Sequence, residues 1–169
     1  IRESLTKPAD AEKYYKMALE LAETKKNDLV AGECLFYLTA LIGKEKIGKE
    51  ENPRVAEAVP YYNKFWDRYG SDSPFKAKVA VAGIPGMAKI GKLDEALERL
   101  QGVIADIAKS PGTPGLEEAI GSYTDAYLKT HTPTELKDHY YSFPRIDSRD
   151  KATRALLRIA IIDVFEGVL

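Results

Sequence analysis

Residues 73 to 103 read SPFKAKVAVAGIPGMAKIGKLDEALERLQGV. Ser73-Pro74 marks a helix start, because proline is tolerated in the first turn and the preceding serine can accept a hydrogen bond from a free backbone N–H. An apolar helical run follows over residues 75–90, Gly91-Lys92 breaks it, and a second amphipathic run begins at Leu93. The pattern predicts two helices joined by a tight turn, a hairpin of about forty residues.

Helix starts of the same kind recur along the chain. Asn52-Pro53, Thr113-Pro114 and Thr132-Pro133 each place a capping side chain before proline, and Glu135 completes a capping box at the last of them. Helices are expected to start near residues 8, 28, 53, 74, 93, 114, 133 and 149. These starts form two interleaved series spaced by about forty residues, as a tandem array of helix pairs requires. Because no segment alternates apolar and polar residues, the sequence predicts an all-α fold of about eight helices without a sheet.

A repeated packing pattern accompanies this spacing. A small residue is followed, four and seven positions later, by residues that share its helix face. The triplets are Ala11, Tyr15, Ala18; Ala58, Tyr62, Phe65; and Ala96, Leu100, Val103. The small residue at the head of each triplet lets a partner helix approach closely, so we expect these positions in the core.

The triplets and the prolines at the repeat ends resemble the tetratricopeptide-repeat family, and the stretch 58–74 is most similar to the longer repeats of bacterial envelope proteins. The first-helix half of the motif is degenerate here, and Pro85 lies inside that helix. Pro85 is expected either to kink the helix locally or to shape a concave surface. The resemblance implies a right-handed solenoid of antiparallel helix pairs, a single domain over residues 1–169, and weakly favours a bacterial periplasm or cell envelope over the cytoplasm.

The same resemblance implies a function. Proteins of this family present a concave surface lined by the first helices, so we expect a protein–protein interaction scaffold that binds a peptide or partner protein. The family register places Lys78 and Lys89 on that surface, with Tyr123 and Tyr127 of the next first helix. The alternative is a structural or accessory helical domain of a larger envelope protein or multidomain enzyme, with no ligand of its own.

Composition and the reactive residues favour no catalytic role. The 25 Lys and Arg residues nearly cancel the 26 Asp and Glu residues, leaving a formal net charge of −1, so no overall field would attract nucleic acid or a membrane surface. Cys34 lies in an apolar helical run and is expected in the core. His131 and His139 are eight residues apart, which does not suit metal ligands on one helix, so we expect surface polar residues. The sequence therefore predicts no enzyme activity, no metal and no cofactor.

The C-terminal region carries two further expectations. Arg149, Arg154 and Arg158 could form an anion-binding face, but nearby aspartates favour the alternative of a solvated face with ion pairs. The segment 151–169 is apolar on more than one side, yet it is too short and too charged for a membrane-spanning helix. It is expected to be covered by a second copy, giving a homodimer, by residues 129–144 folding back, or by further chain, since the sequence begins with Ile1 and reads as a fragment.

Overall fold

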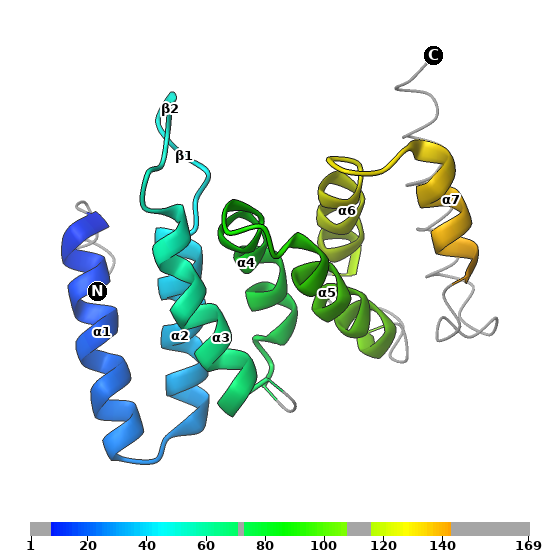
Figure 1. Cartoon of the computed structure of the whole chain (residues 1–169). Helices are drawn as coiled ribbons and strands as arrows, with labels where there is room; N and C mark the ends of the chain where they lie inside the picture. The colour runs from blue at the N-terminus through cyan, green and yellow to red at the C-terminus, as the bar shows by residue number, and fades with distance from the viewer. Residues whose placement is uncertain (1–7, 71–72, 108–115, 143–169) are drawn as a thin grey trace. The chain divides into compact units, whose positions relative to one another are not determined.

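The chain is described by a computed structural model, which places residues 8–70, 73–107 and 116–142. Within these ranges the structure is almost entirely helical, as expected (Figure 1). The chain divides into two compact units, residues 1–96 and 97–169. The helices are α1 (Pro8–Thr24), α2 (Asp28–Ile42), α3 (Val59–Arg68), α4 (Lys76–Lys89), α5 (Leu93–Ile107), α6 (Leu116–Tyr127) and α7 (Pro133–Ser142), with a 3-10 helix η1 (Val55–Ala58) before α3.

Several predicted helix ends are confirmed. The Asn27 side chain accepts a hydrogen bond from the Val30 N–H at the start of α2. Gly91 adopts a left-handed φ of +73°, which a glycine tolerates, in the turn between α4 and α5. Thr132 and Glu135 form the predicted capping box at the start of α7, each accepting a hydrogen bond from the backbone N–H of the other.

Other predicted starts differ or cannot be compared. The helix expected near residue 53 begins as the 3-10 helix η1, and α3 proper starts only at Val59. The N-cap of η1 is Arg54, which makes no side-chain cap bond, whereas the Asn52 side chain binds the Ile42 and Lys44 carbonyls and the Arg54 N–H. The Thr113-Pro114 start and the helix expected near residue 149 lie outside the described residues.

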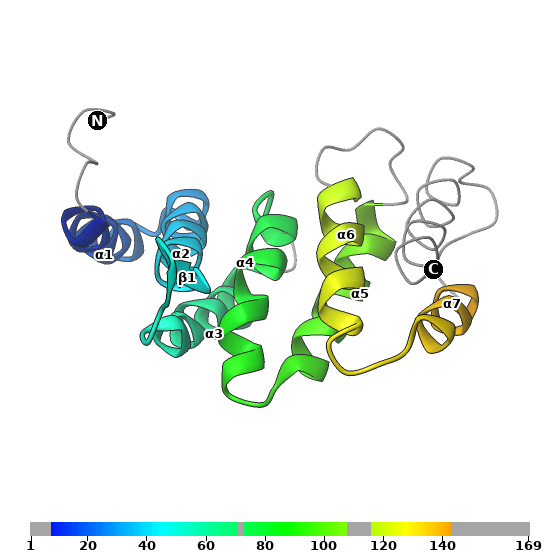
Figure 2. The same cartoon turned by 90° about the horizontal axis from the view of Figure 1, so that it is seen from above.

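The first unit is built around α2, which packs against α1, α3 and α4 (Figure 2). Leu35 and Leu38 of α2 are completely buried. So are Tyr62 and Phe65 of the second predicted triplet, and Ala58 is nearly so. The core prediction is confirmed for the second triplet and for Ala96, Leu100 and Val103, whereas Tyr15 and Ala18 of the first triplet are only partly buried.

A glycine decides how closely α3 approaches α4. A Cβ atom built on Gly83 would lie 2.1 Å from the Tyr62 ring, a distance that no packed side chain can occupy. The ring of Tyr62 therefore lies directly on the α4 backbone at this point. The helix itself runs unbroken through Pro85, so the proline does not split α4.

The connection from α2 to η1 contains a β-hairpin, and the expectation of no sheet is wrong there. Strands β1 (Lys46–Ile47) and β2 (Glu50–Glu51) pair antiparallel, and Gly48 supplies a left-handed φ of +67° in the turn. The hairpin projects past the ends of the neighbouring helices (Figure 1). A two-residue strand is too short to show the alternation by which strands are recognised in a sequence.

The second unit buries apolar side chains from each of its helices. Its most buried residues are Leu97, Leu100, Val103, Ile104, Ala119, Ile120, Tyr123, Ala126 and Leu136. In neither unit is a described helix both long and apolar enough to cross a membrane.

Candidate functional site

Helices α2 and α4 lie side by side and run in the same direction. The Phe36 and Phe75 rings stack with centroids 6.2 Å apart. Gly43 lies seven residues after Phe36, and it packs against the carbonyl of Ala82, which lies seven residues after Phe75. Because the two contacts follow one another in the same chain direction and at the same spacing on both segments, the two helices are parallel neighbours. They are the first two members of the series that starts near residues 28 and 74.

The outer side of this helix pair carries aromatic and basic side chains. Lys78 and Lys89 of α4 are both exposed, and they are three turns apart, so they lie on one side of the helix. The Lys78 ammonium group lies 5.7 Å from the centroid of the Phe36 ring, a cation–π distance. The Tyr37 ring lies 5.0 Å from that of Phe36 but on the side of α1, where it stacks on Tyr15 with centroids 4.8 Å apart. We call the side formed by Phe36, Lys78, Pro85 and Lys89 the α2–α4 face.

An open hollow of about 360 Å³ lies at one end of the face, between the foot of the hairpin and the last turns of α4. Its lining residues are Glu45, Lys46, Glu51, Asn52, Val55, Pro85, Ala88 and Lys89. The hollow is large enough for one or two side chains of a bound segment. Its lining offers charges of both signs above an apolar floor.

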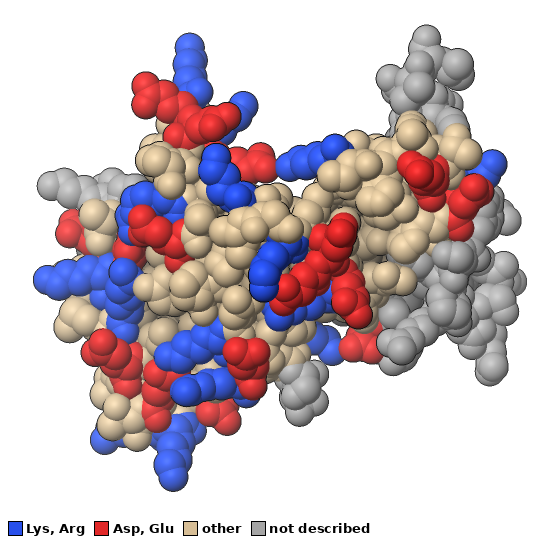
Figure 3. All heavy atoms as spheres, viewed as in Figure 1, with Lys and Arg blue, Asp and Glu red and all other residues tan. Residues whose placement is uncertain are grey.

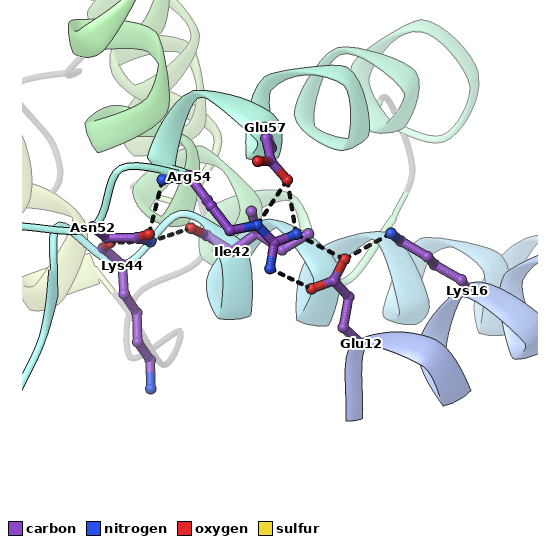
Figure 4. Close-up of polar contacts among 7 residues, drawn as sticks. All are labelled: Glu12, Lys16, Ile42, Lys44, Asn52, Arg54 and Glu57. Carbon is purple, nitrogen blue, oxygen red and sulfur yellow. Dashed lines mark hydrogen bonds and ion pairs between the residues drawn. The ribbon is translucent and has the colours of Figure 1, made fainter. Parts of the chain in front are cut away.

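Asn52 holds the hairpin foot in place (Figure 4). Its side-chain amide donates to the carbonyls of Ile42 and Lys44, at 2.8 and 2.9 Å, while its Oδ1 accepts from the Arg54 N–H. The Asn52 N–H also donates to the Glu45 carbonyl. Because Asn52 is only 5% exposed, these bonds satisfy polar groups that have little access to water.

The lysines around the face have no acidic partner within the chain as described. No carboxylate in residues 8–70, 73–107 and 116–142 lies within ion-pair distance of Lys44, Lys46, Lys78 or Lys89. Helix α4 itself contains lysines and no acidic residue. The side of the molecule drawn in Figure 3 carries interspersed charges of both signs, whereas the charged residues of α4 are all basic.

A second charged region joins α1 to the segment that begins at Arg54. The Arg54 guanidinium donates two hydrogen bonds to the Glu12 carboxylate, both of 3.0 Å, and also contacts Glu57 (Figure 4). Further along α1, the Lys64 ammonium lies 2.7 Å from a Glu23 oxygen. We call these contacts the α1–α3 seam.

The seam shifts the acidity of its groups. Hydrogen bonds from Arg54, and then from Lys16, lower the pKa of Glu12 from 4.5 to about 2. The hydrogen bond from Lys64 lowers the pKa of Glu23. The carboxylates of the seam are therefore held in their charged form by cations of the same chain.

The two tyrosines expected beside Lys78 and Lys89 lie in the second unit. Tyr123 is 2% exposed, and its hydroxyl is hydrogen-bonded to His139 Nε2. Tyr127 is half-buried and stacks on His131, with centroids 3.9 Å apart, and on His139 at 5.0 Å. Tyr123 thus belongs to the core of that unit, and only Tyr127 retains a partly accessible ring.

The expectation that both histidines are surface polar residues is wrong. His131 and His139 are half-buried, and their rings lie against Tyr127 from two different segments. Burial, and then the positive charge of nearby His131, lower the pKa of His139. Their separation of eight residues argued only against metal ligands on one helix, and it did not reveal that the turn before α7 brings the two rings to one tyrosine.

Cys34 is buried in the first unit, as expected, and burial raises the pKa of its thiol. Among the described residues, no group of three or more His, Cys, Asp or Glu gathers that could hold a metal ion. The described residues do not include the predicted anion-binding residues Arg149, Arg154 and Arg158, nor the predicted dimer segment 151–169.

The face includes residues that sequence reasoning did not single out. Phe36 and the hairpin were missed, and Asn52 was singled out only as a helix cap. One signal was present: the connection from α2 to η1 is longer than most loops of compact domains, and such loops are often functional.

Comparison with known proteins gives no further assignment, since no family model matches the chain and neither curated proteins nor solved structures show a significant similarity to it.

Proposed function

We propose that this chain is a protein–protein interaction scaffold that binds a peptide or partner protein on the α2–α4 face. The observation that carries the proposal is the set of unpaired lysines around this face, with Lys78 beside an aromatic pair and Lys89 beside a hollow. Unpaired cations favour a bound segment that carries carboxylates. The aromatic rings would contact its apolar side chains.

The packing of the first unit is compatible with a right-handed solenoid of antiparallel helix pairs, which we propose as the architecture. In such an array, first helices are parallel neighbours and line one surface, and α2 and α4 have this relation. The hairpin between α2 and η1 would extend that surface at one end. Tyr127 would contribute only if the second unit continues the array.

The proposed role is non-catalytic. Cys34 is buried, and its raised pKa makes it a poor nucleophile at neutral pH. His139 is hydrogen-bonded to Tyr123, and His131 stacks on Tyr127. These groups are better explained by packing than by a nucleophile and its base.

Binding can be tested with a random peptide display library selected against the purified chain. A selected peptide is then synthesised with a fluorophore, and its Kd is measured by fluorescence anisotropy. The Lys78→Ala, Lys89→Ala double variant should weaken binding by about tenfold or more, because two charge-assisted contacts are removed. Affinity should also fall as salt is raised.

Lys25→Ala is the matched control, since Lys25 is exposed in the turn between α1 and α2, away from the face. It should leave the Kd unchanged. If no selected peptide binds more tightly than about 1 mM, or if the double variant binds as well as the parent chain, the face is not a binding site. The alternative of an accessory helical domain would then be preferred.

A further inference from the structure

The outer side of α1 is apolar and uncovered by any described residue. Tyr14, Met17 and Leu21 are 57%, 55% and 60% exposed. Spacings of three and four residues place them on one side of the helix. Isolated exposed apolar residues are ordinary, but three in one stripe along a helix are typical of a surface that associates.

A charged flank runs beside this stripe. Lys13 and Glu20 are both exposed, and within the described ranges neither makes an ion pair. They are seven residues apart on one helix, about 10 Å along its axis, so they cannot pair with each other. An open hollow of about 380 Å³, bordered by both residues, Met17 and Arg54, leaves room beside the flank.

The apolar stripe and the charged flank of one α1 helix are complementary to those of a second α1 helix that runs antiparallel to it. Tyr14 lies three residues before Met17 and Leu21 four residues after it, while Lys13 lies four before and Glu20 three after. A second copy of α1, running antiparallel and crossing at Met17, would bring Tyr14 of each chain to Leu21 of the other. It would also bring each Lys13 to the Glu20 of the other chain. A two-fold axis perpendicular to the helices places the two flanks on the same side of the helix pair.

We propose that two copies of this chain associate through the outer sides of their α1 helices, antiparallel about a two-fold axis at Met17. The apolar stripe and two symmetry-related Lys13–Glu20 ion pairs hold the copies together. A parallel arrangement about a two-fold axis would instead place the two flanks on opposite sides of the helix pair, where neither Lys13–Glu20 ion pair can form. A single helix pair buries little area, so the dimer is weak and depends on concentration.

Sedimentation equilibrium of the full chain, from about 1 μM to about 1 mM, tests the association. The parent chain should show a monomer–dimer equilibrium in this range. Lys13→Glu and Glu20→Lys should each raise the Kd by about tenfold, because each places like charges together twice. The double variant K13E/E20K should recover the parent Kd, since it restores both pairs with their signs exchanged.

Met17→Glu should abolish the dimer, because two carboxylates would meet at the crossing point. Ile47→Glu is the matched control: Ile47 is a similarly exposed apolar residue, but it lies in the hairpin. A chain that stays monomeric throughout, or a dimer that Met17→Glu leaves intact, would overturn the proposal. The latter result would place the interface elsewhere, for instance in residues 151–169.

A cross-link checks the geometry. With Cys34 replaced by Ala, a Met17→Cys variant should form an intermolecular disulfide under mild oxidation, since the two residues face each other at the two-fold axis. The same background carrying Lys49→Cys should not. Efficient cross-linking of Leu21→Cys to itself in this background would indicate a parallel arrangement and would contradict the antiparallel dimer, in which these two residues are about 12 Å apart along the helix axis.

Discussion

The α1–α3 seam and the α2–α4 face lie in the same unit but differ in how their charges are used. In the seam, Glu12 and Glu23 meet cations of the same chain. Around the face, Lys78 and Lys89 meet no carboxylate of the described residues. A charge already paired must lose its partner before it can bind another molecule, whereas an unpaired one need not. The difference supports the proposal that the seam serves stability and that the face serves recognition.

The largest effect is expected where α3 and α4 meet beneath the face. A Gly83→Ala change puts a methyl group into the Tyr62 ring and forces the two helices apart, which should cost about 3 kcal/mol. Urea unfolding followed by circular dichroism measures this loss. Gly102→Ala is the control, because nothing lies within 4 Å of a Cβ there, so it should stabilise the chain slightly. Equal stabilities of the parent and Gly83→Ala would show that the helices are less closely packed.

A smaller effect is expected at the foot of the hairpin. Asn52→Ala removes the donors to the Ile42 and Lys44 carbonyls and should cost about 2 kcal/mol. Amide hydrogen exchange should accelerate over residues 44–51, while the seam stays protected. The control Asn27→Ala removes the cap of α2 and should cost about 1 kcal/mol without faster exchange in the hairpin. Unchanged exchange in Asn52→Ala would mean that the hairpin is held by other contacts.

The seam itself should contribute about 1 kcal/mol. Arg54→Met removes the bidentate partner of Glu12, but Arg54 is half exposed, so solvent screens much of the interaction. The variant should unfold at lower urea concentration at pH 7. Arg68→Met is the control, because Arg68 is more exposed and lies 3.5 Å from Glu23, so its effect should be smaller.

The pH dependence sharpens this test. Because the folded-state pKa of Glu12 lies near 2, below the 4.5 of an unpaired glutamate, the stability that it provides is complete above about pH 4.5 and is lost as pH falls toward 2. The stability difference between the parent and Arg54→Met should therefore narrow over this window. A difference that stays constant with pH would mean that Arg54 acts through packing rather than charge.

The helical framework could be predicted from the sequence because its signals are local. Caps such as Asn27 and Thr132, and the spacing of Ala58, Tyr62 and Phe65, depend on residues within one or two turns. The boundary of η1 could not, because Asn52 binds carbonyls about ten residues earlier in the chain.

The candidate face could be predicted only in part. The resemblance to the tetratricopeptide-repeat family led to the choice of Lys78 and Lys89, but their neighbours Phe36 and Asn52 come from segments that the fold brings together. The same limit explains the two histidines, whose contact with Tyr127 depends on the turn before α7. Whether a charged side chain is paired depends on such distant contacts, so the contrast between seam and face was not visible in the sequence.

The smallest effect is expected at the face. Lys89 lines the hollow and makes no ion pair with a described residue, so Lys89→Ala should change the free energy of unfolding by less than about 0.5 kcal/mol. Lys64→Ala is its counterpart in the seam: it leaves the partly buried Glu23 with only the Tyr69 hydroxyl and the more distant Arg68, and it should cost more. Thermal unfolding of the two variants side by side measures the contrast. If Lys89→Ala proved the more destabilising, Lys89 would be serving the fold, and the argument that its charge is available to a partner would fail.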